Sequence, residues 1–290
     1  MDNKVVVKRS GKKTVSIVLH NCLIAIFAGI WLVPIVWLVA SSMSDYTGMN
    51  TSRFFPEKWT LNNYKKLFLE TDSVANFPAW FMNTLIVAIF TCLISTVFVV
   101  MVSYAMSCMR FKGRRAMMNI SVMFNLFPGV LSMIAIYFVL KMLGLTNSHL
   151  GLILAYSGAS GLGYLICKGF FDTVPQSLRD AARIDGASEA RTFTRIVLPI
   201  SRPIIVYTVI SSFMVPWMDF VMAKIILNEG ISSKWTVAIG LYKMVEKEKI
   251  NDYFTLFCAG GVIVSVPISI LFFLMQKCYV EGITGGAVKG

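Results

Sequence analysis

Charged residues are scarce in this chain. Only 14% of its 290 residues are Asp, Glu, Lys or Arg, whereas 56% are hydrophobic and 13% are aromatic. A soluble globular protein is about a quarter charged, so this composition leaves too little polar surface to cover a water-soluble globule. The mean hydropathy of +0.69 agrees. The composition therefore excludes a soluble enzyme, a disordered chain and a nucleic-acid-binding domain, and it predicts a protein embedded in a membrane.

The sequence also lacks the motifs of common enzymes. It contains no G-x-x-x-x-G-K-[ST] phosphate loop, no H-E-x-x-H, no G-x-S-x-G and no paired metal-binding acids. Its six cysteines form no C-x-x-C and lie mostly in apolar stretches, which is typical of free thiols used as small hydrophobic residues. We therefore expect no catalytic residue, metal or cofactor in this chain. Energy for uphill transport would have to come from a partner or an ion gradient.

What the sequence has instead is a series of long apolar segments. A bilayer core requires about 20 apolar residues per helix. Segments of this kind, free of formal charge except for Asp219, predict six transmembrane helices at about 15–44, 80–104, 116–140, 150–167, 203–223 and 253–276. The first segment is about twice as long as the apolar core of a signal peptide, so we expect a retained helix. We assign residues 1–290 to a single all-α integral membrane domain.

Basic residues gather on one side of these predicted spans. They are concentrated at the N-terminus, in the short loop 109–115, in the long loop 172–202 and in the C-terminal tail 277–290, whereas acids nearly balance them in the other connections. By the positive-inside rule, the basic side is cytoplasmic. An even number of spans then places both termini in the cytoplasm, with Cys108 and Cys278 near the cytoplasmic face.

Smaller features suggest how the spans pack. Gly158, Gly161 and Gly163 give the fourth span a small-residue face on which another helix can approach closely. A short amphipathic helix at 60–68 is expected to lie on the outer surface. Four prolines inside the spans predict kinks. They are Pro34, Pro128, Pro216 and Pro267.

The cytoplasmic loop 172–202 is the most informative segment. Pro175 fits the first turn of a helix, and Gly186 fits the position just after its end, where a positive φ is often required. Ser188 can cap a second short helix. Two short helices joined by a bend of small residues would be thin enough to enter a cleft on a partner. From the spacing alone, a solvated loop on the membrane surface is an equal alternative.

The order of residues in this loop resembles the EAA loop of ABC importer permeases. The matching residues are Asp180, Ala181, Ala182, Asp185, Gly186, Ala187, Ile196, Leu198 and Pro199. Asp180 stands where the family usually has glutamate, a conservative departure. Segments 56–68 and 103–114 are similar to carbohydrate importer permeases. Segments 147–149, 219–221 and 282–290 resemble their maltose/maltodextrin and galacto-oligosaccharide subgroup. The length and the six spans match the smaller permease subunit of that subgroup.

The resemblance implies a type I ABC importer permease in the cytoplasmic membrane of a prokaryote. A second, homologous permease subunit would complete a heterodimer, and an extracytoplasmic binding protein would deliver an oligosaccharide. Two ABC ATPase subunits would bind ATP and Mg. The loop would be a coupling helix, with Asp180 paired to an ATPase arginine, Asp185 ordering the bend and Gly186 required for it. The tail is expected between the ATPase subunits through Gly286, Ala287, Val288, Lys289 and Gly290.

The residues of the sugar path are less well defined. Phe124, Asn125, Phe213, Trp217 and Asp219 offer aromatic faces and polar groups at membrane depth. For the aromatic residues, ordinary helix packing is the favoured interpretation. An intramembrane carboxylate is costly without a partner or water, so Asp219 either lines the path or pairs structurally, with Lys224 as a candidate partner. In this family the partner permease can carry most of the sugar contacts, and the sequence does not identify the sugar.

Two other functional classes compete with an importer permease. An ion-coupled secondary transporter would need several charges at membrane depth and inverted repeats. A membrane-embedded transferase or protease would need clusters of acids or histidines at helix ends. Neither signature is visible in the sequence, and neither class explains the pattern from Asp180 to Pro199.

Overall fold

The computed structural model describes residues 11–49, 53–69, 75–227 and 231–287. This part of the chain is helical apart from one isolated β-bridge between Ser44 and Trp59. Three helices are long and apolar enough to cross a membrane over Ser16–Ser42, Phe77–Cys108 and Ile250–Gln276. They belong to α1 (Gly11–Ser42), α3 (Phe77–Cys108) and α14 (Ile250–Ala287). These three helices confirm the predicted first, second and sixth apolar helices.

Three further apolar segments are bent helix pairs. The chain turns by 106° between α4 (Arg114–Asn125) and α5 (Gly129–Met142). It turns by 43° between α6 (His149–Ala159) and α7 (Tyr164–Phe171), which the 3₁₀ turn η1 (Ser160–Gly163) separates. It turns by 82° between Glu189–Ile200 and α11 (Arg202–Met218).

The span predicted at 116–140, with a kink at Pro128, is two helices at a sharp angle rather than one kinked helix. Helix α4 ends at Asn125, and Pro128 precedes α5 with an extended backbone, φ −58° and ψ 121°. Proline has no N–H to continue the ladder and disfavours helical geometry in the residue before it, which explains the break. The predicted helix at 150–167 is interrupted by the 3₁₀ turn η1, which contains two glycines and no proline. The predicted helix at 203–223 ends at Met218, because Asp219 is extended (φ −85°, ψ 128°) before α12 (Val221–Ile226) begins.

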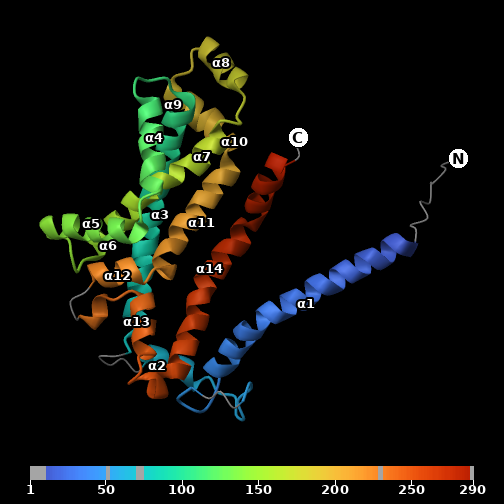
Figure 1. Cartoon of the computed structure of the whole chain (residues 1–290), viewed down its shortest axis with the longest axis vertical. Coiled ribbons are helices and arrows are strands. Elements are labelled where there is room, and N and C mark those ends of the chain that lie inside the picture. Colours follow the sequence, from blue (N-terminus) through green and yellow to red (C-terminus); the bar gives the residue numbers. More distant parts are fainter. Residues whose placement is uncertain (1–10, 50–52, 70–74, 228–230, 288–290) are drawn as a thin grey trace.

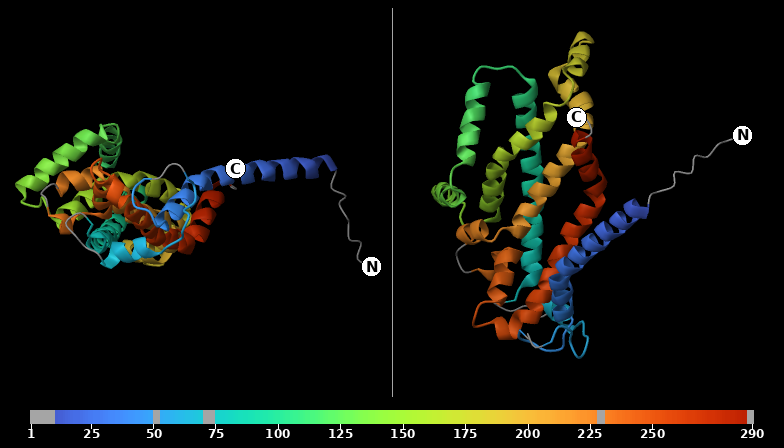
Figure 2. Two further views of the ribbon diagram at one scale, coloured as in Figure 1. Left: turned by 90° about the horizontal axis from the view of Figure 1, so that it is seen from below. Right: turned by 45° about the vertical axis from the view of Figure 1, so that its right-hand side comes forward.

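The long helices form a bundle with two distinct ends (Figure 1). At one end, called here the α8 end, lie the loop between α3 and α4 and the short helices α8 (Gln176–Ile184), α9 (Glu189–Thr192) and α10 (Leu198–Ile200). At the opposite α2 end lie α2 (Asn62–Leu69) and α13 (Val237–Met244). Helix α3 runs between the two ends and contacts α6, α7 and α11 along its length. Helix α1 diverges from the bundle toward its Gly11 end (Figure 2).

Helix α2 is tied to the ends of the long helices. The hydroxyl of Thr60 accepts a hydrogen bond from the backbone N–H of Asn62, the first residue of the helix, at 3.1 Å. The amide of Asn63 donates to the carbonyls of Ser42 and Ser44 at 3.0 and 2.8 Å. Leu67 is fully buried in a cluster with Phe77 and Trp80. The protein itself therefore buries part of the apolar face that the sequence predicted for the membrane surface.

Candidate functional site

Helix α8 is a short, sharply terminated helix. Pro175 precedes it, and Gly186 follows it with φ +74°. The N–H of Ala187 donates to the carbonyl of Ala182 at 2.9 Å, and the N–H of Gly186 donates to the carbonyl of Arg183 at 3.0 Å. This pair of bonds is a Schellman motif, which satisfies the last carbonyls of a helix and requires a left-handed residue at its turn. The predicted helix and its glycine bend are both confirmed.

The α8 helix projects from the bundle (Figure 1; Figure 2, right). Ala182 is buried against the rest of the loop, whereas Ala181, Asp185 and Gly186 are exposed. Leu178 is also exposed, and Ile184, at the end of the helix, is 86% exposed. A projecting helix of small residues with apolar side chains open to solvent has the shape and chemistry to dock into a cleft on another protein.

The segment after Gly186 fixes α8 to the bundle. The hydroxyl of Ser188 accepts from the N–H of Arg191 at 3.3 Å and caps α9, as predicted. A single π turn, η2 (Phe193–Val197), follows. Val197 is fully buried, and the Phe193 ring lies 4.6 Å from that of Tyr104 on α3. Of the remaining motif residues, Ile196 and Leu198 are half-buried, and Pro199 is exposed.

A chain of polar contacts links α8 to α3. The Tyr104 hydroxyl donates to Oε2 of Glu189 at 2.9 Å. Arg183 donates to Oε1 of Glu189 from Nε at 2.9 Å and from Nη2 at 2.7 Å. These hydrogen bonds, that of Arg183 foremost, lower the pKa of the Glu189 carboxyl and keep it ionised. Asp180 contacts the same guanidinium only at 3.4 Å, so its carboxylate is weakly held.

The sequence interpretation did not include Arg183 and Glu189 among the site residues. It noted Tyr104 only as part of a segment similar to carbohydrate permeases. The signal available was the pair of opposite charges on either side of the Gly186 bend, which the Schellman turn brings together. The contact of Glu189 with Tyr104 spans 85 residues of sequence and could not be inferred from spacing.

The C-terminal tail is described only in part. Helix α14 continues to Ala287 and includes Gly286, whereas Val288, Lys289 and Gly290 lie outside the described residues. The end of α14 lies toward the α8 end of the bundle (Figure 1). The predicted contact of the tail with ATPase subunits stays a prediction.

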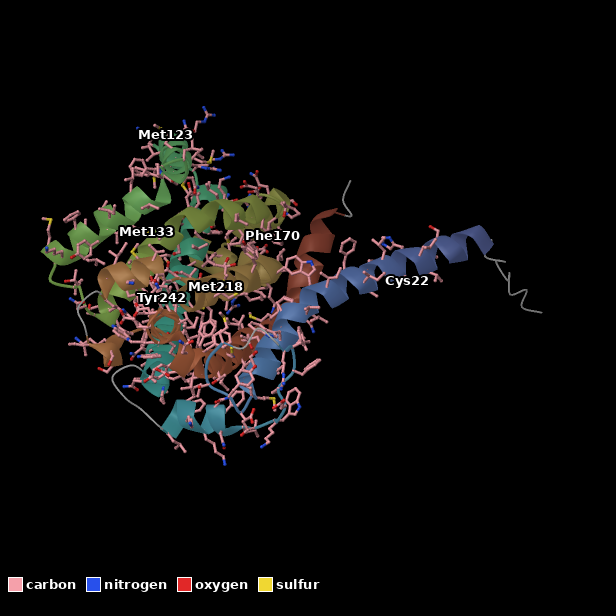
Figure 3. The ribbon with its side chains drawn as sticks, turned by 60° about the horizontal axis from the view of Figure 1, so that its bottom comes forward. Cys22, Met123, Met133, Phe170, Met218 and Tyr242 are labelled. Atoms are coloured by element: carbon pink, nitrogen blue, oxygen red, sulfur yellow. The ribbon has the colours of Figure 1, made fainter. Side chains whose placement is uncertain are left out.

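The structure does not bring all five predicted path residues together. Trp217 is buried, with its ring 5.2 Å from that of Phe81 and 6.0 Å from that of Phe213, which is the helix packing favoured from the sequence. Phe124, on α4, is 65% exposed, and Asn125 is exposed beside it. Their neighbour Met123 lies far from Met218, the neighbour of Trp217 (Figure 3). A path role for these residues stays a prediction.

Asp219 has a structural partner other than the one considered. Its Oδ2 accepts from the Tyr156 hydroxyl at 2.7 Å and from the N–H of Ala223 at 3.0 Å. The carboxylate thereby gives a hydrogen-bond acceptor to a backbone N–H in the N-terminal turn of α12, and through Tyr156 it links α12 to α6. Lys224 instead lies over two aromatic rings, 5.2 Å from the centre of Phe220 and 4.9 Å from that of Tyr242. Whether Asp219 also lines the path stays open.

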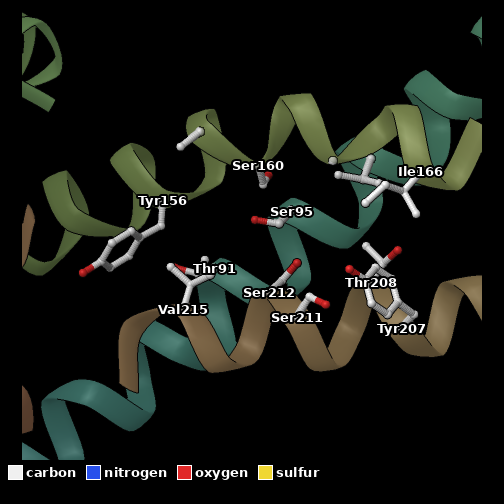
Figure 4. A pocket seen from close by; sticks show the side chains of 13 residues that line it. Thr91, Ser95, Tyr156, Ser160, Ile166, Tyr207, Thr208, Ser211, Ser212 and Val215 are labelled. Atoms are coloured by element: carbon white, nitrogen blue, oxygen red, sulfur yellow. The ribbon is translucent and has the colours of Figure 1, made fainter. Parts of the chain in front are cut away.

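A cavity of about 260 Å³ lies between α3, α6, α7 and α11, adjacent to Tyr156 (Figure 4). Hydroxyl groups dominate its polar lining, and they come from Thr91, Ser95, Tyr156, Ser160, Tyr207, Thr208, Ser211 and Ser212. The Thr91 and Ser95 hydroxyls are buried and have no hydrogen-bond partner within the described part of the chain. The sequence interpretation missed this cavity, although the hydroxyls at positions 207, 208, 211 and 212 share one face of a helix.

The family model for the binding-protein-dependent transport system inner membrane component matches residues 100–284, from the last part of α3 almost to the end of α14. The chain belongs to this family. The galactooligosaccharides transport system permease protein GanQ of Bacillus subtilis is 31% identical over 96% of this chain and 98% of its own length. The maltodextrin transport system permease protein MalD of Streptococcus pneumoniae is 34% identical over 90% of this chain and 92% of its own.

The fold of this family member agrees with a known transporter structure. A chain of a bacterial ABC transporter involved in the import of the acidic polysaccharide alginate superimposes with a TM-score of 0.77. The two chains are 21% identical, and the superposition covers 98% of that chain and 92% of this one. The family resemblance that the sequence suggested is confirmed.

Proposed function

We propose that this chain is the permease subunit of an ATP-driven importer of an oligosaccharide, one like a maltodextrin or a galacto-oligosaccharide. Its six spans would be α1, α3, α4 with α5, α6 with α7, α11 and α14. The Ala287 end of α14 lies toward the α8 end, as does the basic loop 109–115, and α1 runs away from the α2 end toward Gly11 (Figure 1). This arrangement supports a cytoplasmic α8 end with both termini on that side.

The proposed partners are a second permease, two ATPase subunits and an extracytoplasmic sugar-binding protein. The names of the relatives support the substrate class, and the family description supports dependence on a binding protein. The apolar surface of α1 is left uncovered by this chain, with Trp31 77% exposed. Membrane lipid and the second permease would cover it. We place ATP and Mg on the ATPase subunits and no cofactor or nucleic acid on this chain.

The observation that carries the proposal is the α8 helix linked through Glu189 to α3. If an ATPase subunit holds α8 in a cleft, a movement of that subunit is passed through Arg183 and Glu189 to Tyr104 on a membrane helix. The weakly held Asp180 carboxylate would be available to an arginine of the ATPase. The end of α14 lies on the same side, which is compatible with a tail between the ATPase subunits.

For the sugar, we propose a path that passes the hydroxyl-lined cavity of Figure 4. Hydroxyl groups can exchange hydrogen bonds with a sugar, and the Asp219–Tyr156 pair is close to this cavity. Phe213 and Trp217 would then support α11 from behind. Phe124 and Asn125, exposed on α4, would reach the path only from the side of the second permease.

The alternative is an ion-coupled secondary transporter that uses Asp219. To decide between the two, the uptake of a panel of labelled oligosaccharides is measured in a deletion strain that carries this chain with or without its ATPase. We expect one class of oligosaccharide to enter, and only when the ATPase is present. Uptake that persists without the ATPase and stops when the ion gradient is collapsed would assign the chain to secondary transport.

A further inference from the structure

A second hollow, of about 900 Å³, opens at the α8 end of the molecule. It lies between α8 and the segment that joins α3 to α4. Its charged lining consists of four arginines and two acids, namely Arg110, Arg114, Arg179, Arg183, Asp180 and Glu189. Asp180, Arg183 and Glu189 belong to the proposed coupling link, but Arg110, Arg114 and Arg179 have no role in the coupling or in the transport path.

The positive charge in the hollow is not balanced from within. Both acids contact the same guanidinium, that of Arg183. Arg110, Arg114 and Arg179 form no ion pair within the described part of the chain. Nε of Arg179 is buried without a hydrogen-bond partner among the described residues, and Arg114 donates only to the Met109 carbonyl at 3.4 Å. Guanidinium groups grouped in this way repel one another unless an anion lies between them, and their planar forks suit phosphate oxygens.

The surface next to the hollow is apolar. Arg114 is the first residue of α4, and the described part of the chain buries none of the residues of α4. From the first turn onward it exposes a row of large hydrophobic side chains, Met117, Ile120, Met123 and Phe124. On the other side, the apolar stretch of α3 ends at Cys108. An anionic group bound in the hollow would therefore lie where a membrane-spanning segment ends, with an apolar helix face leading away from it.

We propose that the hollow binds the phosphate of an anionic phospholipid, with the acyl chains lying along α4. The headgroup would touch Arg110 and Arg114 on the α3–α4 segment and Arg179 on α8. It would thus join the projecting helix to the membrane surface. This site does not depend on the proposed importer function, because it requires only that the α8 end face a leaflet with anionic lipid.

The test uses the chain in the complex extracted from cells, incorporated into nanodiscs of phosphatidylcholine with phosphatidylglycerol. Native mass spectrometry after release into detergent counts the phospholipids that remain bound. We expect the wild-type chain to retain phosphatidylglycerol in preference to phosphatidylcholine. The double variant Arg110→Gln/Arg114→Gln should bind it roughly 25-fold more weakly, since one arginine near a membrane surface contributes roughly fivefold. Arg115→Gln is the matched control, because Arg115 is the exposed neighbour of Arg114 and does not line the hollow.

Three results would overturn the proposal. Equal retention of phosphatidylglycerol by the double variant and by Arg115→Gln would show that the hollow does not bind it. If phosphatidylglycerol is retained only after the other subunits are removed, a partner protein occupies the hollow in the complex. The hollow would then be assigned to an acidic segment of that partner. A third arm titrates inorganic phosphate into the detergent-solubilised complex. Binding of inorganic phosphate that the double variant loses, with no preference between the two phospholipids, would identify a site for a free anion.

Discussion

Gly186 holds a backbone conformation that other residues adopt only with strain. Its φ is +74°, and a Cβ built on it would meet no atom within 4 Å. The cost of Gly186→Val is therefore conformational, of order 1–3 kcal/mol and confined to the bend. We expect normal amounts of the variant in the membrane, weakened retention of the ATPase and loss of sugar uptake. Immunoblot, pull-down and uptake measurements test these three points.

Two further glycine variants serve as controls for that result. Gly186→Asn should retain most activity, since asparagine tolerates a positive φ. Gly169→Val, in α7, has equal space around its Cβ and no positive φ, so it should transport normally. A coupling role for the α8 bend is refuted if Gly186→Val keeps its ATPase and transports at the wild-type rate.

Tyr104→Phe removes one oxygen from the link between α8 and α3. The ring can still pack on Phe193, so the fold and the assembly should be retained. Without the hydroxyl, Glu189 and Arg183 remain paired to each other but lose their hold on α3. We expect ATP hydrolysis to continue while the amount of sugar imported per ATP falls several-fold. The measurement is the ratio of uptake to hydrolysis in vesicles.

Tyr164→Phe is the matched control for this change. Tyr164 is also a buried tyrosine packed against α3, but its hydroxyl has no hydrogen-bond partner within the described residues. Its loss should leave the ratio unchanged. Equal effects of the two substitutions would mean that Tyr104 acts through packing alone.

Gly240 tests the packing between α13 and α3. A Cβ at this position would lie 2.0 Å from Cε3 of Trp80, whose indole N–H is fixed by the carbonyl of Ser232 at 2.8 Å. The ring cannot move away without losing that bond, so Gly240→Ala should destabilise the protein by about 1–3 kcal/mol or more. Thermal unfolding in detergent measures the effect. Gly158→Ala, with no atom within 4 Å, should unfold at the wild-type temperature.

At the scale of elements, the sequence predicted where apolar helices lie better than where they break. The apolar runs of α1, α3 and α14 are correctly predicted as long helices, because their length and their lack of charge are enough to identify them. The breaks at Pro128, at Ser160–Gly163 and at Asp219 depend on two factors. One is the local backbone preference of these residues, and the other is the packing of the neighbouring helices around each break. A proline inside α1 or α14 leaves the helix continuous, whereas Pro128 ends one. Proline alone therefore does not decide the outcome.

The same division applies to the functional residues. The α8 loop could be predicted because its caps, Pro175, Gly186 and Ser188, act on neighbours only a few residues away. The link from Tyr104 to Glu189 and the cavity between α3, α6 and α11 arise from helices far apart in sequence. A hydroxyl on a membrane helix has the same sequence signature whether it faces a cavity or bonds to its own backbone, as Thr84 does.

The orientation of the whole molecule can be tested with introduced thiols. The predicted position of Cys108 and Cys278 near the cytoplasmic face stays a prediction, because Cys108, near the α8 end, is too buried to be labelled readily and the side chain of Cys278 is not described. Ile184→Cys at the α8 end and Trp59→Cys at the α2 end occupy exposed positions on opposite ends. In a background without other cysteines, we expect a membrane-impermeant thiol reagent to label only Trp59→Cys in intact cells. After the cells are opened, both variants should be labelled in a strain that lacks the ATPase, because a bound ATPase subunit would cover α8.

Labelling of Ile184→Cys from outside intact cells would place the α8 end outside and reject the six-span topology. Equal labelling of both variants in opened cells is the internal control, because it shows that both thiols are reactive. The experiment needs no knowledge of the substrate.

The length of α3 has a geometric consequence. Its 32 residues make a rod of roughly 48 Å, with Tyr104 near one end, Trp80 near the other and the cavity residues Thr91 and Ser95 at the midpoint. If the rod turns about its middle by about 10°, each end moves by roughly 4 Å, in opposite directions. A pull on α8 would then open one end of the bundle while it closes the other. The cavity lies at the midpoint of this rotation, so its size would hardly change. Its access would switch from one side of the membrane to the other.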